Sequence, residues 1–277
     1  MLFSLPAFCG ENFWVHRAEL NSAADEISRH WLTRNWYYNQ TMLGTKHPWF
    51  ALQTGKLSKN GENAFDYSSW KFTTAYGVSL PRVSFGGAFF FNEGHFSSAT
   101  GDDTFIKGKG LGLYMSYTPK PWYLAGSFVA DFSENYYLDD RYDGEGASIR
   151  VEAGKRYNIS RNGRLTPYLT MSHTSLTEPL PSKSKWNFTE LSPGVRLEGS
   201  IPAPWGRLGG NLDMKWAQIL GSQTPGSANG GHEGFKLAAG FDIQEFYATL
   251  NLGIDYLFEI RKGQKNHAVS FALDLRF

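Results

Sequence analysis

The stretch AVSFALDLRF, residues 268–277, decides the fold of this chain. Every second side chain in it is apolar, and the side chains between them are small, polar or charged. This alternation is the pattern of a β-strand with one apolar and one polar face. The apolar set is Val269, Phe271, Leu273, Leu275 and Phe277. We therefore predict an amphipathic last strand with an aromatic residue at its end.

The composition favours many strands over a bundle of helices. Aromatic residues make up 16% of the 277 residues and there are 30 glycines, as expected for a chain rich in strands and turns. No apolar run approaches the roughly 20 residues of a membrane helix. A membrane β-barrel also has a low average hydropathy, because its strands alternate. The net charge of +1 does not indicate nucleic-acid binding, and the single cysteine, Cys9, excludes an internal disulfide.

The same period of two recurs along most of the chain, which predicts twelve strands in all. One face of nearly every strand is aromatic or leucine-rich, and the other carries glycine, serine, alanine and charges of both signs. A closed sheet with the apolar face outward is a membrane barrel with a wet lumen. The other eleven predicted strands are residues 49–56, 68–78, 83–92, 110–117, 122–132, 147–154, 165–171, 191–201, 208–216, 235–241 and 246–258.

The predicted connections alternate in length, as they do in an even-numbered membrane barrel with both chain ends of the sheet on one side. Aromatic residues also gather near strand ends, as the interface girdles of such barrels do. The long connections are residues 58–66, 94–104, 133–145, 176–185 and 221–233, with a shorter one at 261–265. The short connections are residues 79–82, 118–121, 158–163, 202–205 and 242–245.

The segment before the strands has a helical period instead. In RAELNSAADEISRHWL, residues 17–32, Leu20, Ala24, Ile27 and Trp31 form a thin apolar stripe among charged residues. Such a helix needs a surface to lie against. We expect a segment at 1–46 with a helix at about 18–32, followed by a barrel at 47–277. The opening MLFSLPAFCG lacks a basic region, which favours a fragment boundary over a signal peptide.

Three stretches together resemble the translocator domain of autotransporters, the pertactin-like type of the type V secretion system. They are GASIRVEAGKRYNISRNGRLTPYLTM (146–171), LSPGVRLEG (191–199), and NLGIDYLF (251–258) followed by AVSFALDLRF. The resemblance implies a twelve-stranded outer-membrane barrel with a helix in its pore. It also implies export and anchoring of a passenger polypeptide fused upstream, with virulence factors such as adhesins as typical passengers. It implies neither an enzyme nor a cofactor.

The resemblance further implies partners. The outer face would contact membrane lipid and lipopolysaccharide, and the barrel is expected to be a monomer. The last strand would be read by the barrel-assembly machinery through Val269, Phe271, Leu273, Leu275 and Phe277, since an amphipathic edge strand can add to another sheet. Some relatives cut themselves at an Asn-Asn pair before the helix. This chain has no such pair, so that activity is not expected.

If the apolar face points to lipid, parity along each strand assigns the inward side chains. They could pass an extended chain and then bind the helix, or they could simply hydrate the lumen. The predicted pore-lining residues are Lys71, Arg150, Glu152, Arg156, Glu190, Arg196, Glu198, Asp213, Lys215, Lys236, Asp242 and Asp255. The predicted plug-helix residues are Glu19, Leu20, Asp25, Glu26, Ile27 and Arg29.

Two other functions fit parts of the sequence. His173 and Ser175 share the outer face of one strand, and Asn187 begins the next, which resembles the catalytic residues of outer-membrane phospholipase A. However, Leu176-Thr177 follows where that family has Asn-Gly at its oxyanion site. The third possibility is a passive pore or an adhesive barrel. A passive pore without a plug would conduct freely, whereas a translocator closed by the predicted helix would conduct poorly.

Overall fold

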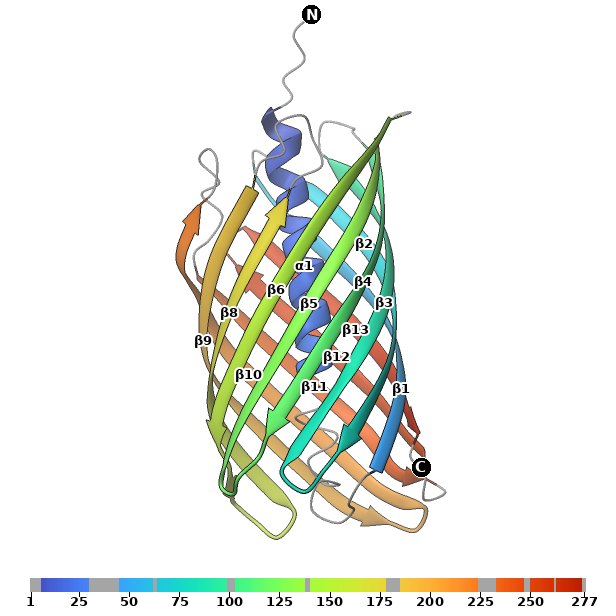
Figure 1. Ribbon diagram of the computed structural model, residues 1–277, viewed down its shortest axis with the longest axis vertical. Helices are drawn as coiled ribbons and strands as arrows, with labels where there is room; N and C mark the ends of the chain where they lie inside the picture. Colours follow the sequence, from blue (N-terminus) through green and yellow to red (C-terminus); the bar gives the residue numbers. More distant parts are fainter. Residues whose placement is uncertain are drawn as a thin grey trace, which may run out of the picture.

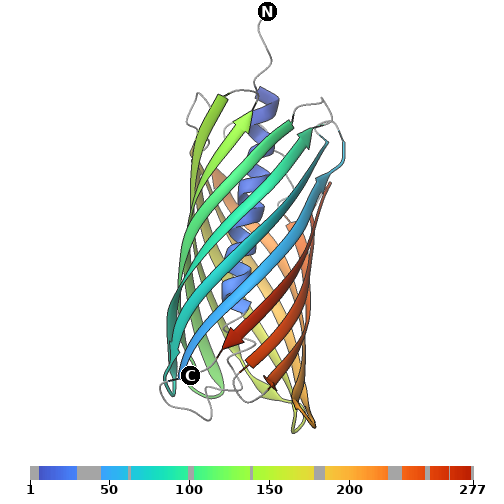
Figure 2. The same cartoon turned by 90° about the vertical axis from the view of Figure 1, so that its right-hand side faces the viewer.

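The computed structural model describes residues 6–29, 45–61, 64–98, 103–137, 140–177, 185–223, 233–246, 250–261 and 263–275. Tilted strands form a closed barrel, and the helix α1 (Pro6–Arg29) runs along its inside (Figures 1 and 2). The predicted all-β, twelve-stranded antiparallel barrel with an N-terminal helix in its pore is confirmed. The Pro6 end of α1 lies at the upper end of the barrel in Figure 1, opposite the short strand connections.

The strands pair in chain order, and the sheet closes where β1 pairs with β13. A thirteenth strand label arises because β7 is a two-residue piece in the turn between β6 and β8, which pair directly with each other. The strands are β1 (Thr45–Lys59), β2 (Phe65–Ser79), β3 (Val83–Ser98), β4 (Asp103–Tyr117), β5 (Trp122–Tyr137), β6 (Asp140–Lys155), β7 (Tyr157–Asn158), β8 (Gly163–Thr177), β9 (Lys185–Ala203), β10 (Gly206–Gln223), β11 (Glu233–Phe246), β12 (Leu250–Arg261) and β13 (Gln264–Leu275).

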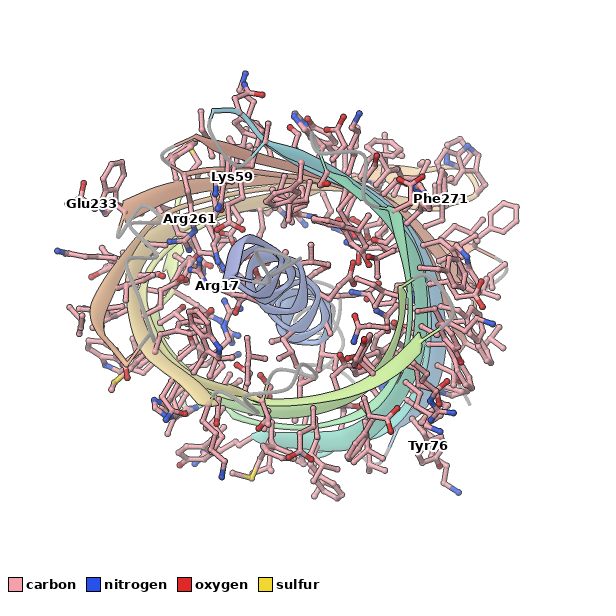
Figure 3. All side chains as sticks on the ribbon, turned by 90° about the horizontal axis from the view of Figure 1, so that it is seen from above. Arg17, Lys59, Tyr76, Glu233, Arg261 and Phe271 are labelled. Carbon is pink, nitrogen blue, oxygen red and sulfur yellow. The ribbon has the colours of Figure 1, made fainter. Side chains whose placement is uncertain are left out.

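The two faces of the barrel wall differ as the alternation predicts. In β4 every second residue is buried, and those between are exposed. Leu113 and Met115 of β4 are 58% and 60% exposed, whereas polar side chains such as Lys71 and Glu152 are buried in the interior. Seen along the barrel, Arg17 of α1 lies inside the ring of strands, and Phe271 and Tyr76 project outward (Figure 3). The outer face is therefore suited to lipid and the inner face to polar contacts.

Exposed aromatic side chains mark two levels of the outer wall. Trp122 lies at the start of β5 beside the short turns, and Phe132 lies ten residues further along the same strand. Ten residues span about 33 Å along a strand. At a tilt of about 40° this gives a height of about 25 Å, the thickness of the apolar band of an outer-membrane barrel. Beyond Phe132, β5 continues for five residues, so the strands extend past the membrane at the upper end.

Several predicted strand boundaries were wrong, because the backbone hydrogen bonds between strands continue where the side chains are no longer apolar. The predicted long connections at 94–104 and 133–145 are mostly strand, and four of the nine residues at 58–66 are strand too, so the strands run further at this end than predicted. The predicted turn at 242–245 lies within β11, and β12 begins at Leu250 rather than at residue 246. Asp242 and Gln244 are buried polar residues of the inner face, so their polarity marks the lumen and not a turn.

The helix is longer than predicted. It begins at Pro6 rather than near residue 18 and ends at Arg29, and residues 30–32 lie outside the described residues. Val15 and Arg17, which precede the predicted start, are buried in the pore. A helix enclosed by a wall is stabilised by packing over its length and not by its own apolar stripe alone. Within the described part of the chain, no helix has the length and apolar content needed to cross a bilayer.

Candidate functional site: the pore and its helix

Apolar side chains of α1 fit against glycines of the wall. Leu20 and Ile27 are almost completely buried. A Cβ added at Gly146 of β6 would lie 2.5 Å from Leu20 Cδ1, and one added at Gly112 of β4 would lie 2.5 Å from Ile27 Cδ1. Such separations are well below van der Waals contact. Glycine at these positions therefore lets the helix approach β4 and β6 closely.

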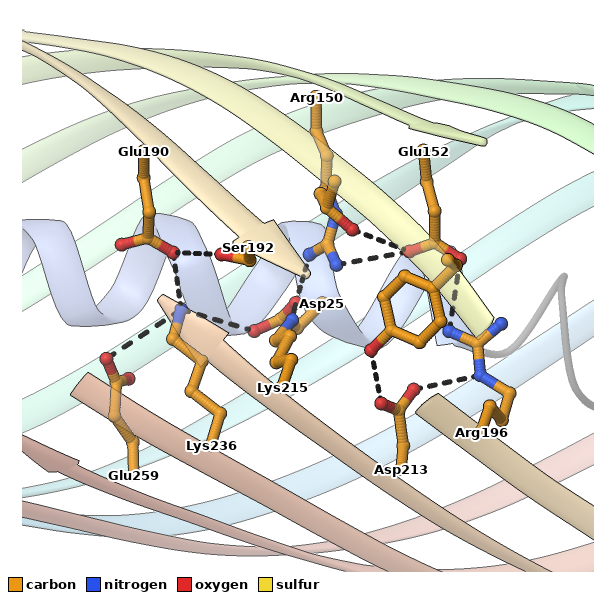
Figure 4. A network of polar contacts seen from close by, with 12 residues as sticks. Asp25, Arg150, Glu152, Glu190, Ser192, Arg196, Asp213, Lys215, Lys236 and Glu259 are labelled. Carbon is orange, nitrogen blue, oxygen red and sulfur yellow. Dashed lines mark hydrogen bonds and ion pairs between the residues drawn. The ribbon is translucent and has the colours of Figure 1, made fainter. Parts of the chain in front are cut away.

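The carboxylate of Asp25 faces three cations of the wall (Figure 4). It accepts a hydrogen bond from Arg150 of β6 and one of 2.6 Å from Lys215 of β10. Lys236 of β11 lies 4.0 Å from its other oxygen. All these side chains are buried or nearly so. A buried charge is stable only when it is paired, so this helix position is electrostatically matched to the lumen.

A second cluster centres on a carboxylate of the wall and takes a cation from the helix. Glu190 of β9 accepts hydrogen bonds from Arg17 Nη2 at 2.9 Å, Lys236 Nζ at 3.1 Å and Arg261 Nη2 at 2.5 Å. Glu259 of β12 lies 3.7 Å from Lys236 and 2.5 Å from Arg261, which offsets part of the positive charge. The two clusters share Lys236, so α1 is tied to β9, β10 and β11 on this side, and β12 joins through Glu259 and Arg261.

The opposite side of α1 is bonded to β1, β2 and β13. Glu26 lies 3.4 Å from Lys71 Nζ and accepts hydrogen bonds of 3.1 Å from the hydroxyls of Thr73 and Ser270. One turn earlier, Ser22 accepts a hydrogen bond from Lys71 and donates one to Gln53 of β1. The Glu19 carboxylate accepts a hydrogen bond of 2.7 Å from Ser69. Polar contacts therefore hold the helix from opposite sides of the lumen.

A further network joins the wall to itself. Glu152 accepts hydrogen bonds from Tyr123, Thr170 and Arg196, and Arg196 also donates to Asp213 at 2.8 Å. Nearer the short turns, Arg164 Nε donates to Glu198 at 2.8 Å. Each of these contacts joins two strands of the wall. Removal of the helix would therefore leave this part of the lumen wall internally paired.

Little space remains between α1 and the wall where cavities are found. Three cavities there have volumes of about 20 Å³ each. One is lined by Glu19 and Gln53, one by Arg17 and Arg261, and one by Asp25. A cavity of this size holds about one water molecule. The helix therefore occupies the pore closely at these levels.

The predicted pore residues mostly lie on the inner face. Lys71, Arg150, Glu152, Glu190, Arg196, Glu198, Asp213, Lys236 and Asp242 are buried, and Lys215 and Asp255 are partly buried. Arg156 is in the turn after β6, with its guanidinium 4.8 Å from the ring of Tyr123. Of the predicted helix residues, Glu19, Leu20, Asp25, Glu26 and Ile27 make the contacts described above. Arg29 ends α1, and its side chain lies outside the described part of the structure.

Some residues that contact α1 were not predicted from the sequence. Gln53, Ser69, Thr73 and Ser270 bond to α1 but were not singled out. The parity that identified the charged inward residues applies equally to these neutral ones. Arg17 was missed for a different reason, because it precedes the predicted helix start. A search for inward polar residues of any charge would have found the wall contacts.

The residues of the predicted assembly signal lie on the outer face where they are described. Phe271 is 51% exposed, and Val269, Leu273 and Leu275 are partly exposed. Phe277 lies outside the described residues. This arrangement agrees with lipid-facing positions on β13. Recognition of β13 by the barrel-assembly machinery stays a prediction.

The residues of the rival hydrolase lie on the outer wall. Ser175 of β8 is directly opposite Asn187 of β9, and His173 is directly opposite Thr189. His173 Nδ1 is 3.0 Å from Thr189 Oγ1, so threonine is the cross-strand partner of the imidazole. A triad would require Asn187 in that position. Among the described residues, no group of three or more His, Cys, Asp or Glu side chains could hold a metal ion.

Comparisons with known proteins agree with this architecture. A family model described as autotransporter beta-domain matches residues 49–261. The beta domain of the Bordetella autotransporter BrkA has a similar structure, with a TM-score of 0.66 at 16% identity, covering 84% of this chain and 99% of that beta-domain chain. The translocator domain of NalP from Neisseria meningitidis gives a TM-score of 0.62 at 12% identity, covering 93% of this chain and 98% of that one.

The transport unit of AIDA-I from Escherichia coli gives a TM-score of 0.62 at 12% identity, covering 94% of this chain and 98% of that one. No curated protein sequence matches the chain significantly. The identities to the solved structures are low, so these structural similarities show a common fold only. The family model matches most of the chain and therefore shows the family to which the chain belongs. This chain therefore belongs to the autotransporter beta-domain family, whose members are translocators of the bacterial outer membrane.

Proposed function

We propose that this barrel exports and anchors a passenger polypeptide joined to the Pro6 end of α1, and that α1 then closes the pore. The observation that carries the proposal is the helix itself, which contacts opposite walls through Asp25, Glu26 and Arg17. An α-helix with its side chains is about 10–12 Å wide. A lumen that fits one helix also fits an extended chain, but not a folded domain.

The polarity of the lumen supports passage of an extended chain. Such a chain carries unpaired backbone N–H and C=O groups, which need polar partners or water. The inner wall offers both donors and acceptors along its length, from Lys236 and Glu190 to Arg196 and Asp213. When α1 enters, its backbone groups are paired within the helix. Its side chains then make specific ion pairs, so the helix is a better permanent occupant than an extended segment.

The direction of export follows from the placement of the helix. The Pro6 end of α1 lies at the end of the barrel opposite the short turns (Figure 1). In outer-membrane barrels the short turns face the periplasm. A polypeptide joined to Pro6 would therefore emerge on the outside, while the barrel keeps it attached to the membrane.

We propose that the chain is not an enzyme. The Ser–His–Asn arrangement on β8 and β9 would need Asn187 to orient His173, and the imidazole instead contacts Thr189. Nucleophilic catalysis depends on a base that is oriented by a third group. The lumen charges are engaged in ion pairs with α1 or with one another, as for Glu152 and Arg196. Such pairing fits a structural role for these groups.

The proposal is tested by export of a reporter. A reporter that can be locked by a single internal disulfide is fused upstream of residue 1, behind a secretion signal, and displayed reporter is measured by protease shaving of intact cells. We expect the reduced reporter to reach the surface and the oxidised one to stall. Equal display of both forms, or display of neither, would contradict export of an extended chain through this pore.

A further inference from the structure

An outward-facing groove crosses strands β1 to β5, from the middle of β1 and β2 toward the upper end of β5. Its volume is about 480 Å³, within the range of small-molecule sites. The groove differs from the three water-sized spaces around α1, because it lies on the membrane side of the wall. Its lining is apolar at the lower edge, with Leu52, Phe72 and Phe132, and charged at the upper edge, with Glu93 and Lys107.

One lysine interrupts an otherwise apolar row of outward side chains. Cross-strand pairing places Leu52, Phe72, Phe91, Lys109 and Phe132 side by side on neighbouring strands. Lys109 therefore stands directly between two phenylalanines, and all three side chains are exposed. The ring of Phe91 packs edge-on against Phe89 at 4.6 Å, which fixes this side of the groove. A cation at such a position borders the apolar band of the membrane.

The next row toward the exterior is charged and internally balanced. It places Glu93, Lys107 and Glu134 side by side. Glu134 accepts hydrogen bonds from Tyr136 at 2.6 Å and from Arg141 at 3.0 Å. The Lys107 ammonium lies over the rings of Phe105 and Tyr136, at 5.3 and 5.9 Å. Lys109 has no carboxylate opposite it on either neighbouring strand, where the register places Phe91 and Phe132.

We propose that this groove binds a phosphorylated lipid of the outer leaflet, with an acyl chain along the phenylalanines and a phosphate on Lys109. The groove matches such a lipid in its charge and in its depth in the membrane. Lys109 pairs with Phe132 on the neighbouring strand and so lies near the upper limit of the roughly 25 Å apolar band, where a lipid changes from chain to head group. A lysine there places its stem along apolar surface and its ammonium at the head groups. Lys107 is flanked by Glu93 and Glu134 in the next row, so the phosphate is assigned to Lys109 alone.

The test is binding of bisphosphorylated lipid A to the purified full-length barrel in detergent, measured by native mass spectrometry across a lipid titration. We expect one tightly retained lipid per barrel. Lys109→Gln should weaken binding about tenfold, because a charge-assisted hydrogen bond is lost. Lys109→Arg should retain it. Lys265→Gln is the matched control, since Lys265 is an exposed lysine of β13 outside the groove.

Two further probes identify the source of the phosphate. Dephosphorylated lipid A should bind about as weakly to the unaltered protein as lipid A does to Lys109→Gln. Inorganic phosphate at millimolar concentration should fail to displace the lipid, because it lacks the acyl chains. Equal binding of phosphorylated and dephosphorylated lipid, or equal effects of Lys109→Gln and Lys265→Gln, would overturn the proposal. Competition by inorganic phosphate alone would overturn it too, by reducing the site to an anion site.

Discussion

Arg17 of α1 and Glu190 of β9 form an ion pair of 2.9 Å, and both side chains are buried inside the barrel. The same carboxylate also binds Lys236 and Arg261 of the wall. The helix thus supplies one of three cations to a carboxylate that belongs to the pore. A chain that passed through the lumen would have to break this contact. The ion pairs between α1 and the wall should therefore determine how firmly the pore is closed.

Asp25→Asn should loosen the plug. The change leaves Arg150, Lys215 and Lys236 around a neutral amide, and breaking one side of a buried ion pair costs about 3–5 kcal/mol. Even half of that energy would raise the open population more than tenfold. Single-channel recording in planar bilayers should show frequent openings.

The matched control is Glu198→Gln, which breaks a pair between two wall strands. Glu198 binds Arg164 on the neighbouring strand near the short turns, so its loss should leave openings rare. If both variants opened equally often, the effect would come from general loosening of the lumen and not from the helix.

Reversal of the Glu26–Lys71 pair should show that the two charges interact directly. The two groups lie 3.4 Å apart and both are buried. Glu26→Lys places two cations together and should open the pore, as should Lys71→Glu with two anions. The double variant restores opposite charges and should recover at least part of the closed baseline. Additive opening in the double variant would show that the pair does not couple helix and wall.

A bulkier residue at Gly112 should displace the helix without altering a charge. A Cβ there would lie 2.5 Å from Ile27 Cδ1, while its other neighbours are at least 3.6 Å away. Gly112→Val should therefore raise conductance, since overpacking costs about 1–3 kcal/mol. Adding Ile27→Ala should return it to the closed baseline. Gly210→Ala is the control, because the nearest atom to its Cβ is 3.9 Å away. Failure of Ile27→Ala to rescue would contradict the close fit.

The sequence predicted the barrel well and the helix contacts only in part. Strand alternation identifies which face of the wall is apolar, so Leu113 and Phe271 could be placed outside and Glu190 inside. Strand ends were less predictable, because polar residues such as Asp242 are tolerated on the inner face within a strand. The partners of Asp25 come from three strands that are far from it in sequence, and register across the barrel decides which cations meet. No local pattern contains that information.

The outer wall gives a prediction about membrane placement. Leu113 is exposed near the middle of β4, and Phe105 is exposed close to the upper end of the same strand. Leu113→Arg should reduce the free energy of unfolding in lipid vesicles by about 2–4 kcal/mol, and Phe105→Arg by at most about 1 kcal/mol. Urea titration followed by tryptophan fluorescence measures both. Equal losses would contradict the depth assigned to the apolar band.

The most direct test of the account is the single-channel conductance of the full chain compared with a variant that lacks residues 1–44 and begins at β1. The helix fills the pore and leaves cavities of about 20 Å³ at the levels of Glu19, Arg17 and Asp25. We therefore predict a low baseline for the full chain and a large, steady conductance after the deletion. Equal, large conductance in both proteins would contradict a pore closed by α1.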